Sequence, residues 1–146
     1  MPTDAPDTLA EAPRILPGLD DVNRPFWTGG ARGELMIQRC GGCGRFVHPP
    51  VSKCPDCGGE LRAEPVSGRG TVFTFTVNRH PFNPEVPLPY VIAIVELVEQ
   101  TDLRVVTNLV DCDPEALEIG MPVRVAFEDR GEIFVPVFEP DSDARG

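Results

Sequence analysis

The chain has 146 residues, 41% of them hydrophobic, and its 23 acidic and 13 basic residues give a formal net charge of −10. A protein this acidic is a poor general binder of nucleic acid, because such binding depends on basic side chains that neutralise phosphates. No apolar run approaches the roughly 18 residues that a membrane-spanning helix needs. We therefore expect a globular cytoplasmic protein of one domain or two small ones, with no membrane contact.

Residues 1–19 contain four prolines and scattered acidic residues but no apolar stretch. This composition is typical of disordered segments, and it lacks the hydrophobic core of a signal peptide. We interpret these residues as a disordered leader and take the cytoplasm as the compartment.

A short helix is predicted within residues 20–33. Asn23 is a candidate cap, Pro25 falls in the first turn, and a glycine pair follows to end the helix. A helix of two turns is marginal in water, so Phe26 and Trp27 must dock on something. Two interpretations stay open: these rings cover another part of their own chain, or they form an apolar surface for a partner.

The centre of the sequence holds two Cys-x-x-Cys pairs, each followed directly by glycine. Zinc binds thiolates at about 2.3 Å, and a turn that ends in glycine can aim two of them at one point. Strands are expected around the pairs, at 34–39, 45–50 and 60–66. Residues 34–66 therefore predict a rubredoxin-like zinc ribbon whose structural Zn²⁺ is bound by Cys40, Cys43, Cys54 and Cys57.

Other uses of these cysteines fit less well. Two disulfides would need an oxidising compartment, and a thioredoxin-like redox pair usually occurs once, in front of a helix. Iron is the competing metal, because it also accepts four thiolates. His48 lies between the pairs and outside both turns, so we expect it on the ribbon surface and not among the ligands. A site closed by four sulfurs stabilises a fold and does not catalyse.

From Gly70 onwards the sequence pattern changes to that of strands. Strands are predicted at 71–78, 90–99, 103–110, 122–128 and 133–138, with one helical turn at 113–118. Asp113 as a cap and Pro114 in the first position favour that turn. Five strands with a short helix between the third and the fourth follow the order of an OB-fold. Residues 67–140 therefore predict a five-stranded OB-fold barrel in a mainly β protein, followed by a tail at 141–146.

Two further features belong to the barrel segment. Residues 80–89 contain four prolines and form a stiff extended loop, which either borders the ligand face or covers an open barrel edge. Cys112 lies between Asp111 and Asp113, whose carboxylates raise the pKa of its thiol, so we expect an ordinary strand-end residue. The sequence contains no nucleophile elbow, phosphate loop or dinucleotide fingerprint.

Residues 22–140 resemble a known family, the zinc-ribbon/OB-fold proteins associated with acyl-CoA metabolism. The resemblance is carried by PFWTGGARGELMIQRCGGCGRFVHPPVSKCPDCG, by SGRGTVFTFTV and YVIAIVELVE, and by the closing GMPVRVAFED. Members similar to this chain are non-catalytic subunits or fused domains. They act beside thiolase-fold enzymes, including the aldolases that shorten steroid side chains, or beside hot-dog-fold enoyl-CoA hydratases.

The resemblance implies an accessory subunit that binds a thiolase-fold acyl-CoA enzyme, either a thiolase or a steroid side-chain aldolase, and helps to form its acyl-CoA channel. Such a chain is no enzyme on its own but part of an acyl-CoA transferase or carbon-carbon lyase complex. No hydratase segment precedes residue 20, so we expect it to find its enzyme non-covalently. The alternatives are a subunit of a hot-dog-fold hydratase and a nucleic-acid-binding ribbon/OB protein, which the net charge disfavours.

The resemblance also implies positions for the site residues. By it, the four cysteines are the zinc ligands, and the helix with Phe26 and Trp27 docks the partner, together with Phe82. CoA carries phosphates, so a groove that binds it needs basic side chains. The candidates flank the first barrel strand, and a solvated strand-end cluster is the alternative interpretation: Arg69, Arg79 and His80.

Overall fold

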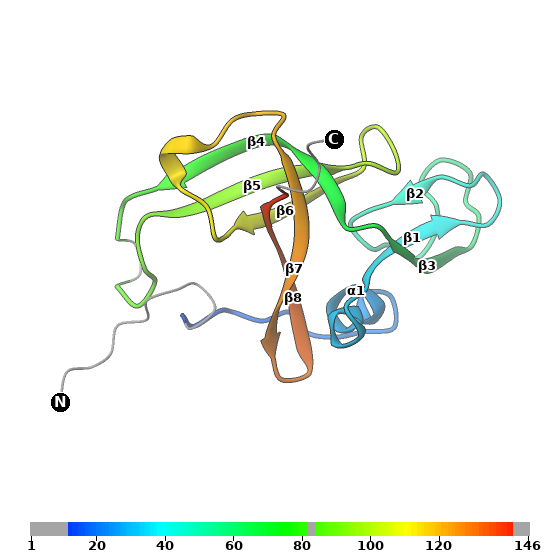
Figure 1. The fold of residues 1–146 in the computed structure, drawn as a ribbon. Coiled ribbons are helices and arrows are strands. Elements are labelled where there is room, and N and C mark those ends of the chain that lie inside the picture. Colours follow the sequence, from blue (N-terminus) through cyan, green and yellow to red (C-terminus); the bar gives the residue numbers. More distant parts are fainter. Residues whose placement is uncertain (1–11, 82–83, 142–146) are drawn as a thin grey trace.

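The protein is described by a computed structural model that covers residues 12–81 and 84–141, and its regular structure is mainly strand (Figure 1). The elements are α1 (Arg24–Thr28), η2 (Gly29–Arg32), β1 (Leu35–Cys40), β2 (Phe46–Val47), β3 (Leu61–Val66), β4 (Arg69–Asn78), β5 (Tyr90–Leu97), β6 (Arg104–Leu109), η3 (Pro114–Ala116), β7 (Pro122–Arg130) and β8 (Ile133–Pro140). They form a three-stranded sheet in the order β2-β1-β3 and a closed barrel in the order β4-β5-β6-β8-β7. The predicted fold class is thereby confirmed. None of the described helices is long and apolar enough to cross a membrane.

The first described residues run along the barrel, as the blue trace in Figure 1 shows. Ala12 is 2% exposed, and its carbonyl oxygen accepts a hydrogen bond of 2.7 Å from Arg130 Nη1. Arg14 donates two further hydrogen bonds to the Glu128 carboxylate, at 2.7 and 3.0 Å. Ala12 and Arg14 are therefore ordered by side chains far along the sequence, which departs from the disordered leader predicted for this part of residues 1–19. Residues 1–11 lie outside the described part.

The helical segment packs on its own chain. Phe26 is 6% exposed and belongs to the main hydrophobic core, and the Trp27 ring meets it edge-on with 4.8 Å between ring centroids. Phe26 therefore covers its own chain, one of the two interpretations left open, whereas Trp27 is partly exposed, and docking of a partner there stays a prediction. The capping prediction is also wrong: the Asn23 side chain makes no cap and instead accepts a hydrogen bond of 2.8 Å from the Asp20 N–H.

The three-stranded sheet and the barrel are joined without a linker. β1 pairs antiparallel with β2 and with β3, from Leu35↔Val66 to Cys40↔Leu61 in the second case. Only two residues separate β3 from β4, and Gly68 allows the close turn because it has a φ of 77°. A Cβ atom at Gly68 would collide with Val125 Cγ1. The ribbon sheet is thus placed directly beside one end of the barrel (Figure 1).

The barrel strands alternate between core and surface, as the sequence pattern predicts. In β5 the buried residues are Val91, Ala93, Val95 and Leu97, and in β6 they are Val105, Thr107 and Leu109. The chain between β6 and β7 forms the expected helical turn, η3, and the Asp113 side chain caps it by accepting a hydrogen bond from the Glu115 N–H at 2.9 Å. Closure between β6 and β8 rests on one parallel pair, Leu109↔Phe138.

Candidate metal centre and adjoining cavities

The four cysteines of the two Cys-x-x-Cys pairs converge on one point. Their Sγ atoms all lie within 4.8 Å of one another. Two pairs run between the two knuckles, with 3.4 Å from Cys40 Sγ to Cys57 Sγ and 3.8 Å from Cys43 Sγ to Cys54 Sγ. A tetrahedron with metal–sulfur bonds of about 2.3 Å has edges of roughly 3.8 Å, so the sulfurs need little movement to surround an ion. The chain therefore contains a metal site of four sulfur donors.

The backbone of each knuckle makes this convergence possible. Gly44 and Gly58 both have positive φ angles, 76° and 73°, which side chains disfavour. Each donates its N–H to the first cysteine of its own pair, to the Cys40 and Cys54 carbonyl oxygens, at 2.9 Å in both cases. The Gly42 N–H also points at Cys40 Sγ, at a distance of 3.3 Å. These hydrogen bonds fix the shape of the two turns that bring the sulfurs together.

The charges of the thiols favour a cation at the centre. A hydrogen bond from the Cys43 backbone N–H helps to lower the pKa of Cys40 to about 6. The hydrogen bond between Cys57 and Cys40 raises the pKa of Cys57 to about 12, because a second thiolate beside the first is repelled. A divalent cation removes this repulsion and allows all four sulfurs to ionise. The donor set leaves no open position for water, so its role is structural.

His48 is placed differently from the prediction. Its ring packs against that of Phe26 at a tilt, with 4.7 Å between centroids, and burial lowers its pKa to about 4, so it is neutral at pH 7. It is partly buried between the ribbon and α1 and is not an exposed surface residue. It also lies outside the cysteine group, as the sequence predicts.

A cavity of about 520 Å³, here called the junction groove, opens where ribbon, helix and barrel meet. Most of its walls are apolar. The helix supplies Phe26 and Trp27, the ribbon supplies His48 to Pro50, and the barrel supplies residues of β5, β6 and β8. The size and the lining are typical of pockets that bind small ligands or cofactors.

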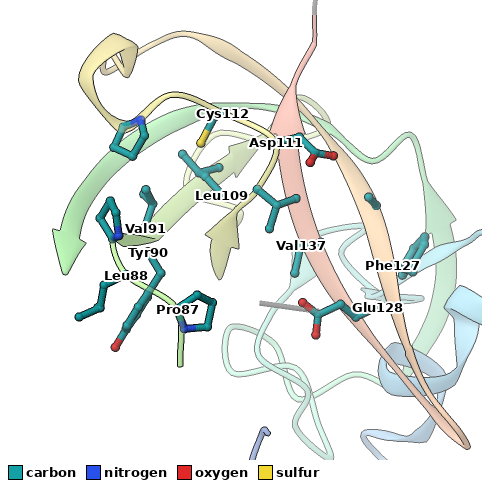
Figure 2. Close-up of a pocket in the computed structure, with 14 residues that line it drawn as sticks. Pro87, Leu88, Tyr90, Val91, Leu109, Asp111, Cys112, Phe127, Glu128 and Val137 are labelled. Carbon is teal, nitrogen blue, oxygen red and sulfur yellow. The ribbon is translucent and has the colours of Figure 1, made fainter. Parts of the chain in front are cut away.

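A second cavity of about 470 Å³, here called the barrel-mouth cavity, lies at the end of the barrel beside the proline-rich loop (Figure 2). Figure 2 shows Pro87, Leu88 and Tyr90 on one side and Val137 and Glu128 on the other. Tyr90 also lines the junction groove, so the two cavities are neighbours. Cys112 lines the barrel-mouth cavity too, and burial together with Asp111 and Asp113 raises the pKa of its thiol.

A buried ion cluster separates the two cavities. The Glu128 side chain is 5% exposed and accepts hydrogen bonds from Arg14 and from Arg130, the latter at 2.9 Å. Burial alone would raise the pKa of Glu128, but the hydrogen bonds and charges of the two arginines outweigh it and lower the pKa. Arg14 lines the junction groove and Glu128 lines the barrel-mouth cavity. The sequence offers no signal for this pairing, because 114 positions separate the two residues.

The predicted CoA-binding residues do not come together. β4 spans ten residues, so Arg69 and Arg79 lie roughly 30 Å apart along the strand. Arg69 faces Asp141 at 3.9 Å, and Arg79 donates to Glu115 at 3.2 Å. His80 is exposed beside Arg79, and none of the three is among the residues that line the two cavities. Phe82, predicted to dock a partner, lies outside the described residues.

The ribbon and the closed barrel together define a zinc-ribbon/OB-fold protein, and comparison with known proteins identifies the family. A model of the rubredoxin-like zinc ribbon domain of ChsH2 matches residues 27–62, and a model of the C-terminal OB-fold domain of ChsH2 matches residues 63–128. A DUF35 domain-containing scaffold protein from Methanothermobacter thermautotrophicus is 37% identical over 99 residues, which are 66% of this chain and 73% of that protein. The chain belongs to the DUF35 family of ChsH2-type ribbon/OB-fold proteins.

Two further matches concern enzymes. A probable enoyl-CoA hydratase alpha subunit from Thermomonospora curvata is 41% identical over 135 residues, or 89% of this chain. The chain spans only 42% of that subunit's length. Among solved structures, a chain of the Ltp2-ChsH2(DUF35) aldolase is 39% identical and superimposes with a TM-score of 0.75, which covers 86% of this chain and 98% of that one.

Proposed function

We propose that this chain is a non-catalytic accessory subunit of a cytoplasmic acyl-CoA enzyme. It binds a thiolase-fold partner, a thiolase or an aldolase, and completes the channel through which the acyl-CoA reaches the partner's active site. The single observation that carries this proposal is the match to the Ltp2-ChsH2(DUF35) aldolase, which extends over ribbon and barrel together.

The metal in this proposal is Zn²⁺, held by Cys40, Cys43, Cys54 and Cys57. Four thiolates at near-tetrahedral spacing suit zinc, and the closed site gives it a structural role. Elemental analysis of the purified chain should find about one zinc per chain. A preparation that folds fully with iron, or with no metal, would contradict this assignment.

The cavities support the channel part of the proposal. The junction groove is mostly apolar, as a path for an acyl chain and its thioester arm requires, and it adjoins the barrel-mouth cavity across the Arg14–Glu128 ion pair. Trp27 lines the groove at the molecular surface and keeps its proposed place at the partner interface. Phe26 acts beneath it as a support. Arg79 and His80 stay candidates for contact with CoA phosphates, and Arg69, at the far end of β4, would need a separate contact.

Co-expression tests the proposal. The chain is produced together with candidate thiolase-fold subunits encoded beside it, with a tag on one subunit only. We expect a complex of fixed stoichiometry that processes acyl-CoA, while the isolated chain has no activity. Two proteins that elute separately and an enzyme that is fully active alone would overturn it.

A hot-dog-fold hydratase subunit is the second candidate partner, and the similarity to a probable enoyl-CoA hydratase alpha subunit favours it. The same co-expression with hydratase-type subunits separates the two candidates. A hydratase complex would add water across an enoyl-CoA double bond, whereas the thiolase-fold complex would form or cleave a carbon-carbon bond.

A further inference from the structure

One edge of β6 lacks a strand partner over most of its length. The Leu97 N–H donates to the Leu103 carbonyl at 2.8 Å, which sets the phase of the antiparallel β5-β6 ladder. In that phase the N–H and C=O groups of Val105 face β5, and those of Arg104 and Val106 face the opposite side. Val110 lies an even number of residues from Val106, so its main-chain groups should face the same side. Its N–H does point away from β5 and donates to the Phe138 carbonyl at 2.8 Å.

Proline at position 136 explains why the pairing of β6 with β8 does not extend to the residues before Leu109 and Phe138. The parallel ladder between β6 and β8 is confined to Leu109↔Phe138 in the described chain. Its next step would require an N–H group at position 136 to reach the Val106 carbonyl, and proline has none. The Thr107 hydroxyl donates to the Pro136 carbonyl at 3.1 Å instead. The main-chain groups of Arg104 and Val106 are therefore left facing the space between β6 and β8.

That space is the junction groove, whose lining includes Arg104, Val106 and Pro136. Both arginines of the groove are already in ion pairs: Arg14 with Glu128 at 2.7 Å, and Arg104 with Asp102 at 3.1 Å. His48 is neutral at pH 7. The groove thus offers apolar walls and a row of peptide donors and acceptors, but little net charge.

We infer that the junction groove holds the pantetheine arm of an acyl-CoA, laid along the β6 edge like an added strand. This inference rests on the proposed function and names the part of the ligand that this site takes. The arm is narrow, uncharged and flexible, and it carries two amides separated by a β-alanine unit. Its amides can pair with the N–H and C=O groups of Arg104 and Val106, which lie about 7 Å apart along the strand.

The charge of the groove assigns the rest of the ligand elsewhere. The CoA nucleotide carries phosphates that require unpaired cations or helix N-termini, and the groove provides neither. The nucleotide therefore lies outside the groove, on the barrel surface or on the partner enzyme. The acyl end then continues towards the catalytic residues of the partner.

Amide NMR on the zinc-loaded full-length chain tests this inference. Pantetheine and CoA should both shift the Arg104 and Val106 amide signals downfield and slow their hydrogen exchange in a saturable way. Adenosine 3′,5′-bisphosphate, which lacks the arm, should leave both amides unchanged. Equal effects from this nucleotide would overturn the inference. So would a result in which neither pantetheine nor CoA slows exchange of the two amides, in the chain alone or in the complex.

Two substitutions at one position separate main chain from side chain. Val106→Pro removes only an N–H on the open edge, because that group takes no part in the β5-β6 ladder. It should weaken pantetheine binding about tenfold, whereas Val106→Ala, which keeps the N–H, should change it less than twofold. Equal losses in the two variants would contradict the inference. If Val106→Pro does not fold, the amide protection measured in the unaltered chain decides.

The outcomes also distinguish this inference from the proposed function. If the partner complex forms and is active but pantetheine changes neither the shifts nor the exchange of the β6 amides, the inference fails and the proposed function stands. If a peptide from the partner protects these amides and pantetheine cannot displace it, the edge is a docking strand and the inference is wrong. If no complex forms with any acyl-CoA enzyme, the proposed function itself fails.

Discussion

The ribbon and the barrel are both β-structures, yet different forces hold them together. The ribbon's own buried cluster consists of Cys40, Cys54 and Val47, with Leu61 packed against it. The main core, by contrast, joins buried side chains from all five barrel strands with Phe26 and β1. So few apolar groups cannot offset the entropy of ordering the knuckles, whereas the main core gains about 25 cal/mol for each Å² of apolar surface it buries. The ribbon depends on its ion, and the barrel does not.

This difference matters for the proposed function, because both regions contribute residues to the lining of the junction groove. His48 to Pro50 come from the ribbon, and β6 and β8 come from the barrel. Loss of an ion from the ribbon is therefore expected to disturb one wall of the groove. Substitutions that weaken one region at a time should therefore have separable effects on the ribbon and on the barrel.

The largest effect is expected at the metal site. Cys54→Ser removes one of four sulfur donors, and structural zinc sites contribute about 10 kcal/mol or more to folding in small zinc domains. We expect loss of zinc in elemental analysis and loss of ordered amide signals from residues 40–60, while the barrel signals remain. Cys112→Ser is the matched control and should keep full zinc content. A barrel that unfolds together with the ribbon would show that the two regions are not separable.

The barrel should respond in the opposite way. Phe138→Ala empties a fully buried site in the main core, and comparable truncations cost about 3–5 kcal/mol. Denaturant unfolding should show this loss, with the zinc content of the folded fraction unchanged. Ile119→Ala, at a side chain that is 68% exposed, should cost less than about 0.5 kcal/mol. Zinc loss caused by Phe138→Ala at ambient temperature would contradict the separation of forces.

Local patterns in the sequence were sufficient to predict both regions. The spacing of the cysteines and the glycine after each pair locate the knuckles, because the turn geometry is encoded within five residues. Alternating residues locate the barrel strands for the same reason. The same level of reasoning also bears on the proposed CoA contacts, because the predicted strand 71–78 places Arg69 and Arg79 at its opposite ends and so at two separate contacts.

The remaining errors concern contacts between distant positions. Arg14 belongs to a segment whose composition resembles disorder, and its hydrogen bonds to Glu128 and Asn108 lie about a hundred positions along the chain. His48 has an unremarkable local sequence, and its burial depends on Phe26, which precedes the ribbon. Contacts between such distant positions leave no periodic pattern in the sequence. The open β6 edge is a similar case, because it requires Pro136 to face Val106 across the barrel seam.

A substitution of the buried Glu128 carboxylate tests how firmly the segment with Ala12 and Arg14 is bound to the barrel. Glu128→Gln leaves two arginines beside a neutral group, and removing one partner of a buried ion cluster costs about 3 kcal/mol. The lowered pKa of Glu128 means that its stabilisation is full above the ordinary glutamate pKa and is lost as pH falls through the lowered value. Unfolding curves of the two proteins should therefore converge at acidic pH. Glu132→Gln, at an exposed side chain, is the control, and a constant difference at all pH values would contradict the assignment.

The smallest effect concerns the contact that orients the ribbon on the barrel. The Gln100 side chain accepts a hydrogen bond from the Phe46 N–H at 2.8 Å and donates one to the Phe46 carbonyl at 3.0 Å. Gln100→Ala should cost only about 1 kcal/mol, because each such bond contributes little net stability. It should nevertheless change the residual dipolar couplings that report the relative orientation of the two regions. Gln100→Glu keeps the accepted bond and should have a smaller effect, and Thr101→Ala should have none. Unchanged couplings in Gln100→Ala would mean that β3, β4 and the packed α1 alone set the shape of the junction groove.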